Sequence, residues 1–200
     1  HYLNTLGVKG IAESALTKMH DSKLVESPAD FYDNLTVSKL ENAGFSHRQA
    51  LLNMARIYMI DNPNAKEDDE LEDLISAAYS DKIKVPMWQF IAALGIPGAG
   101  KAAAQALVAH FGDFDKIQKA TKADLGGVAD VGDVTADAIV EFFENNSPWI
   151  SDCLRSLELE GPKVGKFSGK TFVFTGGFVG GKQKLEKEVI ERGGKVSGSV

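Results

Sequence analysis

The stretch Ala93-Leu94-Gly95-Ile96-Pro97-Gly98-Ala99-Gly100-Lys101 joins the apolar end of one predicted helix to the start of another, at residues 102–108. Its turn, Gly98-Ala99-Gly100, places two glycines around an apolar residue. Glycine permits backbone angles that other residues resist, and it lets the main chain approach a ligand closely. The unpaired N–H groups and the positive dipole end of the following helix favour a phosphate. The stretch therefore predicts a helical hairpin whose turn binds phosphate, with Lys101 adding a positive charge.

The same pattern of apolar residue, glycine turn and helix occurs in three further places, at residues 3–9, 40–48 and 125–132. Internal repetition of this kind predicts a fold built from one recurring unit. The spacing between copies is irregular, which favours separate hairpins packed together over a solenoid. The first 160 residues are therefore expected to form a compact domain of four helical hairpins.

The three further copies match the turn less completely, because each lacks one of the two glycines. The triplets are Thr5-Leu6-Gly7 followed by Lys9, Gly44-Phe45-Ser46 followed by His47 and Arg48, and Asp130-Val131-Gly132 followed by Asp133. We expect the third copy to be the strongest phosphate-binding turn and the fourth to be mainly structural. A glycine turn can also be a plain connector between helices, and for any single copy this alternative stays open.

The pattern changes after residue 160. Residues 161–166 contain glycine and proline and are expected to be a linker. A β-rich run at residues 170–175, a helix at 182–192 and a second strand from residue 195 then follow. Residues 167–200 are therefore expected to be an α/β domain whose second half is missing.

The charge is unevenly distributed. The chain has a net charge of −6, but acidic residues are concentrated in an insertion at about residues 61–85, expected to be a loop and helix at the surface. Basic residues dominate from Lys163 to Lys195, so the total says little about any one face. Cys153 is the single cysteine, which excludes a disulfide and a four-cysteine zinc site within the chain and fits a reducing cytoplasm. We expect this cysteine to be buried and inert.

The four hairpins, in this order, resemble the helix-hairpin-helix domain of bacterial-type NAD-dependent DNA ligases. Residues 4–9 with 24–32 are similar to that family's first repeat, and residues 93–97 with 109–112 to its third. Residues 167–176 with 193–197 are similar to the start of its C-terminal BRCT domain. The resemblance covers nearly the whole chain. It implies a mainly α fold of four helix-hairpin-helix motifs followed by a truncated α/β, BRCT-like domain.

The resemblance also implies a function. In that family the hairpin domain closes on nicked double-stranded DNA, so this segment would clamp the duplex without regard to its sequence while the ligase seals nicks in replication and repair. The residues expected to contact DNA are Gly7, Lys9, Gly44, Arg48, Gly98, Ala99, Gly100, Lys101 and Gly132.

The chemistry of such a ligase would lie outside this chain. The family's adenylation domain has a Lys-x-Asp-Gly nucleophile, which does not occur here, so we expect no catalytic residue and no bound metal or cofactor in this segment. The resemblance implies NAD, magnesium and zinc for the rest of the enzyme. The implied partners are DNA and the adenylation and oligonucleotide-binding domains, in the same chain or a separate subunit. A cytoplasmic location is expected.

Several other interpretations of the same residues are weaker. Residues 95–101 satisfy most of a P-loop, but Ala102 replaces the hydroxyl that would hold magnesium and the preceding segment is expected to be a helix rather than a strand. Thr175-Gly176 matches the Thr-Gly pair of a BRCT phosphate pocket, although a plain connector is an equal alternative. The chain could also be a stand-alone scaffold of a DNA repair complex without ligase activity, or a module that binds other proteins.

Overall fold

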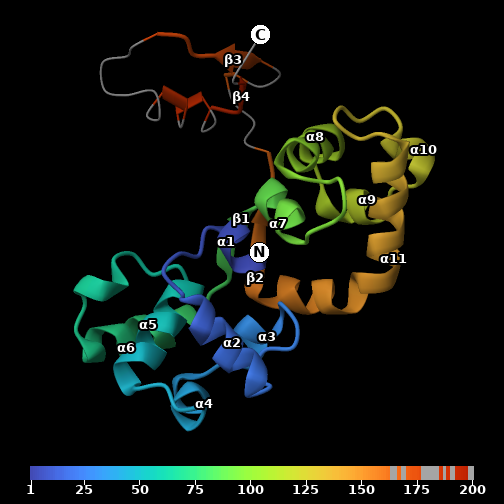
Figure 1. The fold of residues 1–200 in the computed structure, drawn as a ribbon. Helices are drawn as coiled ribbons and strands as arrows, with labels where there is room; N and C mark the ends of the chain where they lie inside the picture. Colours follow the sequence, from blue (N-terminus) through green and yellow to red (C-terminus); the bar gives the residue numbers. More distant parts are fainter. Residues whose placement is uncertain (163–165, 168–169, 177–184, 187, 190–191, 198–200) are drawn as a thin grey trace. The chain divides into compact units, whose positions relative to one another are not determined.

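The computed structural model describes residues 1–162, 166–167, 170–176, 185–186, 188–189 and 192–197. The chain divides into two compact units, His1–Leu159 and Glu160–Val200. The first unit is almost entirely helical (Figure 1), so the expected mainly α fold is confirmed. Each unit is described below by itself.

Two helical hairpins form the first half of unit 1. Hairpin 1 consists of α1 (Tyr2–Leu6) and α2 (Glu13–Asp21), and hairpin 2 of α4 (Val37–Asn42) and α5 (His47–Ile57). The short helix α3 (Asp30–Asp33) lies between them in the sequence. Because the apolar residues of α5 recur at helical spacing, one face of this helix is buried and the other carries its polar side chains.

Two further hairpins form the second half. Hairpin 3 consists of α7 (Met87–Ala93) and α8 (Lys101–Phe111), and hairpin 4 of α10 (Lys122–Leu125) and α11 (Asp133–Ser156). They are joined by α9 (Phe114–Gln118). The helix α7 precedes the glycine turn of hairpin 3, so the helix expected there is confirmed and the strand of a P-loop is absent from that position.

Aromatic packing holds these two hairpins together. The ring of Phe114 contacts Phe90 of hairpin 3 edge-on, with ring centroids 5.5 Å apart, and Phe143 of hairpin 4, with centroids 5.9 Å apart. The long helix α11 contains Pro148, which removes a helical N–H donor and bends the helix in its course (Figure 1). Below this bend Arg155 pairs with Asp33 of α3 at 3.0 Å, so α11 connects the two halves of the unit.

The acidic segment forms a loop and a helix whose acidic side chains face solvent, and the apolar face of this helix packs into the core. It contains a 3-10 turn, η1 (Pro63–Ala65), then α6 (Asp68–Ala78) and β1 (Ile83–Pro86), which pairs with β2 (Leu157–Glu160). Leu71 and Ile75 lie one helical turn apart and are buried, as are Ile83 and Val85. The acids of α6 occupy the opposite, solvent-facing side, so α6 is an ordinary amphipathic helix despite its many acidic residues.

A single hydrophobic core extends through both halves of unit 1. Cys153 belongs to it and is fully buried, as expected. Burial raises the pKa of its thiol to about 11, so the thiol is protonated at neutral pH and is a poor nucleophile.

Unit 2 contains a parallel pair of strands, β3 (Thr171–Val173) and β4 (Lys195–Ser197), with Phe172 opposite Val196. Parallel neighbours need a crossover between them. Residues 185–186 and 188–189 of the intervening segment are helical, while the remainder of the helix expected at 182–192 lies largely outside the described residues. The rings of Phe167 and Phe172 pack with centroids 4.9 Å apart.

Candidate nucleic-acid interface

The turns of hairpins 1, 3 and 4 share a left-handed residue at one position. Each has a left-handed residue two positions before the residue that caps the second helix, with φ of 84° at Gly10, 77° at Gly98 and 61° at Asp130. In hairpins 3 and 4 a hydrogen bond also closes the turn at the same place, from Ala99 N–H to the Ile96 carbonyl (3.0 Å) and from Val131 N–H to the Val128 carbonyl (3.2 Å). Hairpin 4 therefore repeats the backbone of hairpin 3, with an aspartate where hairpin 3 has glycine.

This geometry corrects the alignment of hairpin 1. The sequence pattern placed Gly7 at the second turn glycine, whereas Gly7 ends α1 and corresponds to Gly95 of hairpin 3. The counterpart of Gly98-Ala99-Gly100 is Gly10-Ile11-Ala12. The spacing from Leu6 to Ala12 equals that from Leu94 to Gly100, and this signal could have identified the correct triplet.

The second helix of each of these three hairpins begins without a side-chain cap. The N-cap residues are Ala12 for α2, Gly100 for α8 and Gly132 for α11, and none makes a side-chain capping hydrogen bond. Helices usually begin with Ser, Thr, Asp or Asn, whose side chains accept a hydrogen bond from the first free N–H groups. At these exposed ends the N–H groups stay available to an external anion.

The two turn glycines of hairpin 3 have different reasons to be glycine. Gly98 has a positive φ, and a Cβ on it would lie 2.6 Å from the Thr135 hydroxyl oxygen at the start of α11. Gly98 therefore lets the turns of hairpins 3 and 4 pack side by side. Gly100 has φ −72°, which any residue adopts, and a Cβ there would meet nothing within 4 Å.

Gly132 repeats the situation of Gly100 in hairpin 4, with φ −88° and open space at the Cβ position. Neither backbone conformation nor internal packing requires glycine at these two N-caps. A close approach by a ligand does account for it, because a missing Cβ leaves the main-chain N–H groups fully accessible. Gly100 and Gly132 therefore leave the main-chain N–H groups at these two helix starts open to a ligand.

Cationic side chains stand beside two of the three open turns. Lys101 is exposed, and its ammonium lies 5.4 Å from the centre of the Trp88 ring, a cation–π contact that orients it. Lys9 is exposed in the turn of hairpin 1. A residue that sequence reasoning missed is Arg56 of α5, whose Nε would lie 3.0 Å from a Cβ on Gly10. No local sequence pattern connects Arg56 with a turn that lies about 45 residues earlier.

Hairpin 4 has no such cation in its turn. Asp130 and Asp133 are both exposed there, and Lys122 is paired with Asp137 at 2.6 Å within the same hairpin. The hydrogen bond that the Lys122 ammonium donates to the Asp137 carboxylate raises the pKa of Lys122. The backbone of hairpin 4 is thus that of an open turn, while its side chains make the surface acidic.

Hairpin 2 differs from the other three. Its left-handed residue two positions before the N-cap is Gly44, with φ 86°, but this is also the glycine that ends α4. Only Phe45 and Ser46 therefore lie between the helix-ending glycine and α5, whereas residues 96–100 lie between Gly95 and α8. Ser46 forms a complete capping box with Gln49, in which each residue accepts a hydrogen bond from the other's backbone N–H. The Gly44 carbonyl accepts a hydrogen bond from the ammonium of Lys18, which also lies over the Phe45 ring. Arg48 pairs with Asp68 at 2.6 Å. The predicted contacts Gly44 and Arg48 are therefore already occupied within the protein.

The pair Thr175-Gly176 is exposed in unit 2, directly after β3, and Gly176 has φ 92°. Residues 177–184, which follow this pair, lie outside the described residues.

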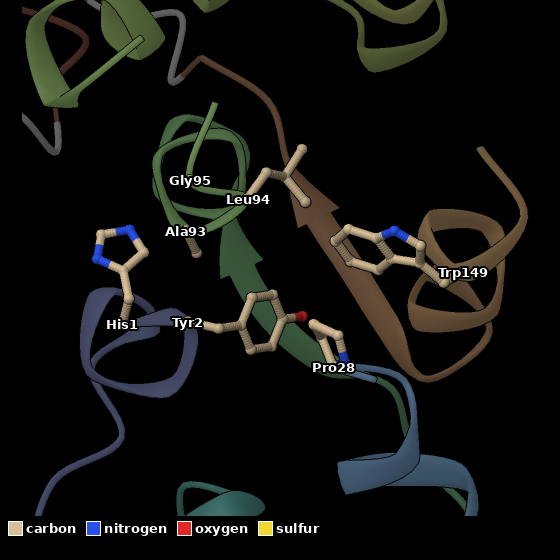
Figure 2. Close-up of a pocket in the computed structure, with 7 residues that line it drawn as sticks. All are labelled: His1, Tyr2, Pro28, Ala93, Leu94, Gly95 and Trp149. Atoms are coloured by element: carbon tan, nitrogen blue, oxygen red, sulfur yellow. The ribbon is translucent and has the colours of Figure 1, made fainter. Parts of the chain in front are cut away.

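A separate cavity of about 510 Å³ lies behind hairpin 3. Figure 2 shows that His1 and Tyr2 line it from α1, Trp149 from α11, and Ala93, Leu94 and Gly95 from the end of α7. The ring nitrogen Nε2 of His1 lies 3.2 Å from the Ala92 carbonyl oxygen. This lining is mainly apolar, so the cavity is unsuited to an anion.

No described helix combines the length and the apolar character that crossing a membrane requires. Within the same residues, no group of three or more His, Cys, Asp or Glu side chains is arranged to hold a metal ion.

Comparison with known proteins matches the second half of unit 1 to a family described as "Helix-hairpin-helix motif", over residues 89–150. This range contains most of hairpin 3 and most of hairpin 4, whose helix α11 continues to Ser156. The prediction of helix-hairpin-helix motifs is therefore confirmed for these two hairpins.

Similar proteins include DNA ligases of several prokaryotes. The chain is 32% identical to the DNA ligase of Bacillus licheniformis, over 98% of the chain and 28% of the relative. It is 30% identical to that of Desulforamulus reducens, over 98% and 28%, and 28% identical to that of Methylacidiphilum infernorum, over 98% and 26%. The chain thus spans about a quarter of the length of these relatives. The resemblance to a segment of bacterial-type DNA ligases is confirmed.

Proposed function

We propose that this chain is the duplex-holding segment of a bacterial-type, NAD-dependent DNA ligase, and that it binds the DNA backbone through the open turns of hairpins 1, 3 and 4. The observation that carries the proposal is the pair of uncapped glycines, Gly100 and Gly132, at helix starts where nothing inside the protein requires glycine. The similarity to DNA ligases over 98% of the chain supports the same function.

The binding mode follows from the groups that the turns present. The first N–H groups of α8 and α11 would donate to phosphate oxygens, and charged acceptors make such hydrogen bonds short and strong. Lys101 would add a charge next to the phosphate on α8. Contacts of this kind position a protein on DNA without reading bases, so the binding is expected to be independent of sequence. Because main-chain donors provide much of the contact, the net charge of −6 is compatible with it.

The rest of the ligase would supply the chemistry of nick sealing in replication and repair. We propose that an adenylation domain and an oligonucleotide-binding domain work with this segment, and that NAD, magnesium and zinc are held by those other parts. In this chain the start of unit 2, with its parallel strands β3 and β4, is proposed to open a BRCT-like domain. Thr175 and Gly176 remain its candidate phosphate contacts.

The direct test of the proposed DNA binding replaces the two N-cap glycines of hairpins 3 and 4 with aspartate. Gly100→Asp with Gly132→Asp places a carboxylate where each phosphate would bind, while aspartate is a favourable N-cap that leaves folding intact. We expect affinity for a 20-base-pair duplex to fall by about 10-fold to 100-fold, measured by electrophoretic shift. The melting temperature should not fall.

The matched control adds the same two charges at helix starts that already have side-chain caps, through Ser46→Asp and Thr121→Asp. We expect this variant to bind within about threefold of the unmodified chain, since it affects the duplex only through screened, longer-range charge. Equal losses in the two double variants would show that the open turns have no special role.

Participation in a ligase is tested by complementation. A Bacillus licheniformis ligase that lacks the segment matched by this chain would be mixed with the chain, NAD, Mg²⁺ and a nicked duplex, and sealing would be followed on a denaturing gel. We expect sealing to rise with the unmodified chain and not with the Gly100→Asp, Gly132→Asp variant. If the chain binds DNA but does not increase sealing, its proposed role in a ligase is wrong, while the proposed binding of DNA by the open turns still stands.

A further inference from the structure

The two cationic side chains at the start of α5 are both paired with acids of the same protein. Arg48 Nη1 lies 2.6 Å from Asp68 Oδ1, and its Nη2 donates to the Asn64 carbonyl at 3.4 Å. The ring of His47 is bracketed by two carboxylates, with Nδ1 3.0 Å from Glu41 and Nε2 3.1 Å from Glu72. Asp68 and Glu72 lie one turn apart on α6 and thus face α5 together.

We infer that α6 is an internal competitor for DNA phosphate at hairpin 2. This inference rests on the proposed DNA grip. The carboxylates of Asp68 and Glu72 bind the basic side chains that would otherwise be open to a phosphate at the start of α5. Together with the capping box of Ser46 and the contact of Lys18 on Gly44, they engage the basic side chains and the Gln49 N–H at the start of α5. The protein therefore restricts its contact with the duplex to the other three hairpins.

The helix α6 is held in place by apolar packing rather than by these ion pairs. Leu71 and Ile75 are buried against the core, and Tyr79 packs edge-on against Tyr58 of α5, with ring centroids 5.2 Å apart. On the surface, exposed ion pairs contribute little to stability. The acids can therefore be neutralised without displacing the helix, which makes the inference testable by a gain of binding.

The experiment compares two double variants of the 200-residue chain that change the net charge equally. Asp68→Asn with Glu72→Gln releases Arg48 and leaves His47 paired with Glu41 alone. Asp69→Asn with Asp73→Asn removes two acids of the same helix that form no ion pair with a described residue. Affinity for a duplex is measured over a range of salt concentrations, and the helical circular dichroism signal confirms folding.

We expect the first variant to bind the duplex about threefold to tenfold more tightly. The slope of log affinity against log salt should steepen by about one for the added phosphate contact. The control should gain less than about twofold, with an unchanged slope. Adding Arg48→Ala to the first variant should return both values to those of the unmodified chain.

Each outcome separates the two proposals. If the unmodified chain binds duplex and both double variants gain equally, or if Arg48→Ala does not reverse the gain, the competitor role of α6 is wrong while the grip of the open hairpins stands. If the unmodified chain binds no duplex at low salt, the proposed function fails and the competitor role fails with it.

Discussion

Hairpins 2 and 3 begin from the same sequence pattern and end in opposite states. In hairpin 3 the helix starts at an uncapped glycine, and the turn is exposed beside Lys101. In hairpin 2 the helix start is capped by Ser46, and the nearby cations are bound by acids of α4 and α6. Because the first free N–H groups of a helix must be satisfied by a side chain, water or a ligand, a self-capped helix start has fewer of these groups to offer a phosphate. The two hairpins therefore differ in whether the start of the second helix lacks a side-chain cap, rather than in the glycine pattern.

The largest effect on folding should come from Gly98→Ala. Alanine at a positive φ costs about 1 kcal/mol, and its Cβ would overlap the Thr135 hydroxyl, so we expect the free energy of unfolding to fall by about 2 to 3 kcal/mol. The matched control, Gly100→Ala, should change it by less than about 0.5 kcal/mol, because reduced freedom of the unfolded chain offsets a poorer N-cap. Denaturant unfolding followed by circular dichroism measures both. Equal losses would contradict the division of roles between the two glycines.

A smaller loss is expected for Ser46→Ala in hairpin 2. Removing the capping box should lower the free energy of unfolding by about 1 kcal/mol and leave duplex affinity unchanged, because this turn makes no proposed contact with DNA. The same unfolding and electrophoretic-shift measurements apply. A clear drop in duplex affinity for this variant would mean that hairpin 2 does take part in binding.

One substitution in hairpin 4, Asp130→Gly, would give its turn the glycine that hairpin 3 has at the same position. Asp130 has φ 61°, a conformation that favours glycine, so Asp130→Gly should raise the free energy of unfolding by about 0.5 kcal/mol. The change also removes a negative charge from an open turn, and duplex affinity should rise by about threefold. Thermal unfolding and binding titrations would show this. A lower affinity would indicate that the Asp130 carboxylate itself contributes to recognition.

The smallest effect concerns His47. The hydrogen bond to Glu41, together with the charges of Glu41, Glu72 and Asp68, raises its pKa above the ordinary value of 6.5. The protonated ring is the form that these acids stabilise, so the contribution of the contacts is complete below the unfolded-state pKa and is lost as the pH rises through the higher folded-state pKa. Glu41→Gln should lower the pKa of His47, measured by NMR titration of its ring protons. An unchanged pKa would mean that Glu41 does not hold the ring in solution.

The parts that could be predicted from sequence are those determined by local interactions. The helix, turn and helix of hairpin 3 follow from residues within about 20 positions of one another, and the buried Cys153 follows from its apolar helix. The turn of hairpin 1 was misaligned because a glycine that ends a helix and a glycine within a turn look alike in sequence. Its true counterpart became visible through the φ of Gly10.

Longer-range features could not be predicted in this way. Nothing near Arg48 indicates that its charge is bound by Asp68, and nothing near Ile83 indicates that β1 pairs with β2, more than 70 residues later. The buried apolar face of α6 did have a local signal, the four-residue spacing of Leu71 and Ile75, but the many acidic residues around it made this spacing easy to overlook. Of the predicted contact residues, the structure leaves those of hairpin 3 exposed or next to an exposed backbone, and it engages Gly44 and Arg48 elsewhere.

The open N-caps have a consequence for anyone who engineers this protein. At Gly100 and Gly132 almost any capping residue would make the helix start more favourable, so the chain retains glycine where a more stable alternative is one substitution away. A selection for heat resistance alone would therefore enrich replacements at these two positions early. The resulting variants would survive heating and purify well, yet under the proposed binding mode they would bind the duplex less tightly without any visible defect in folding.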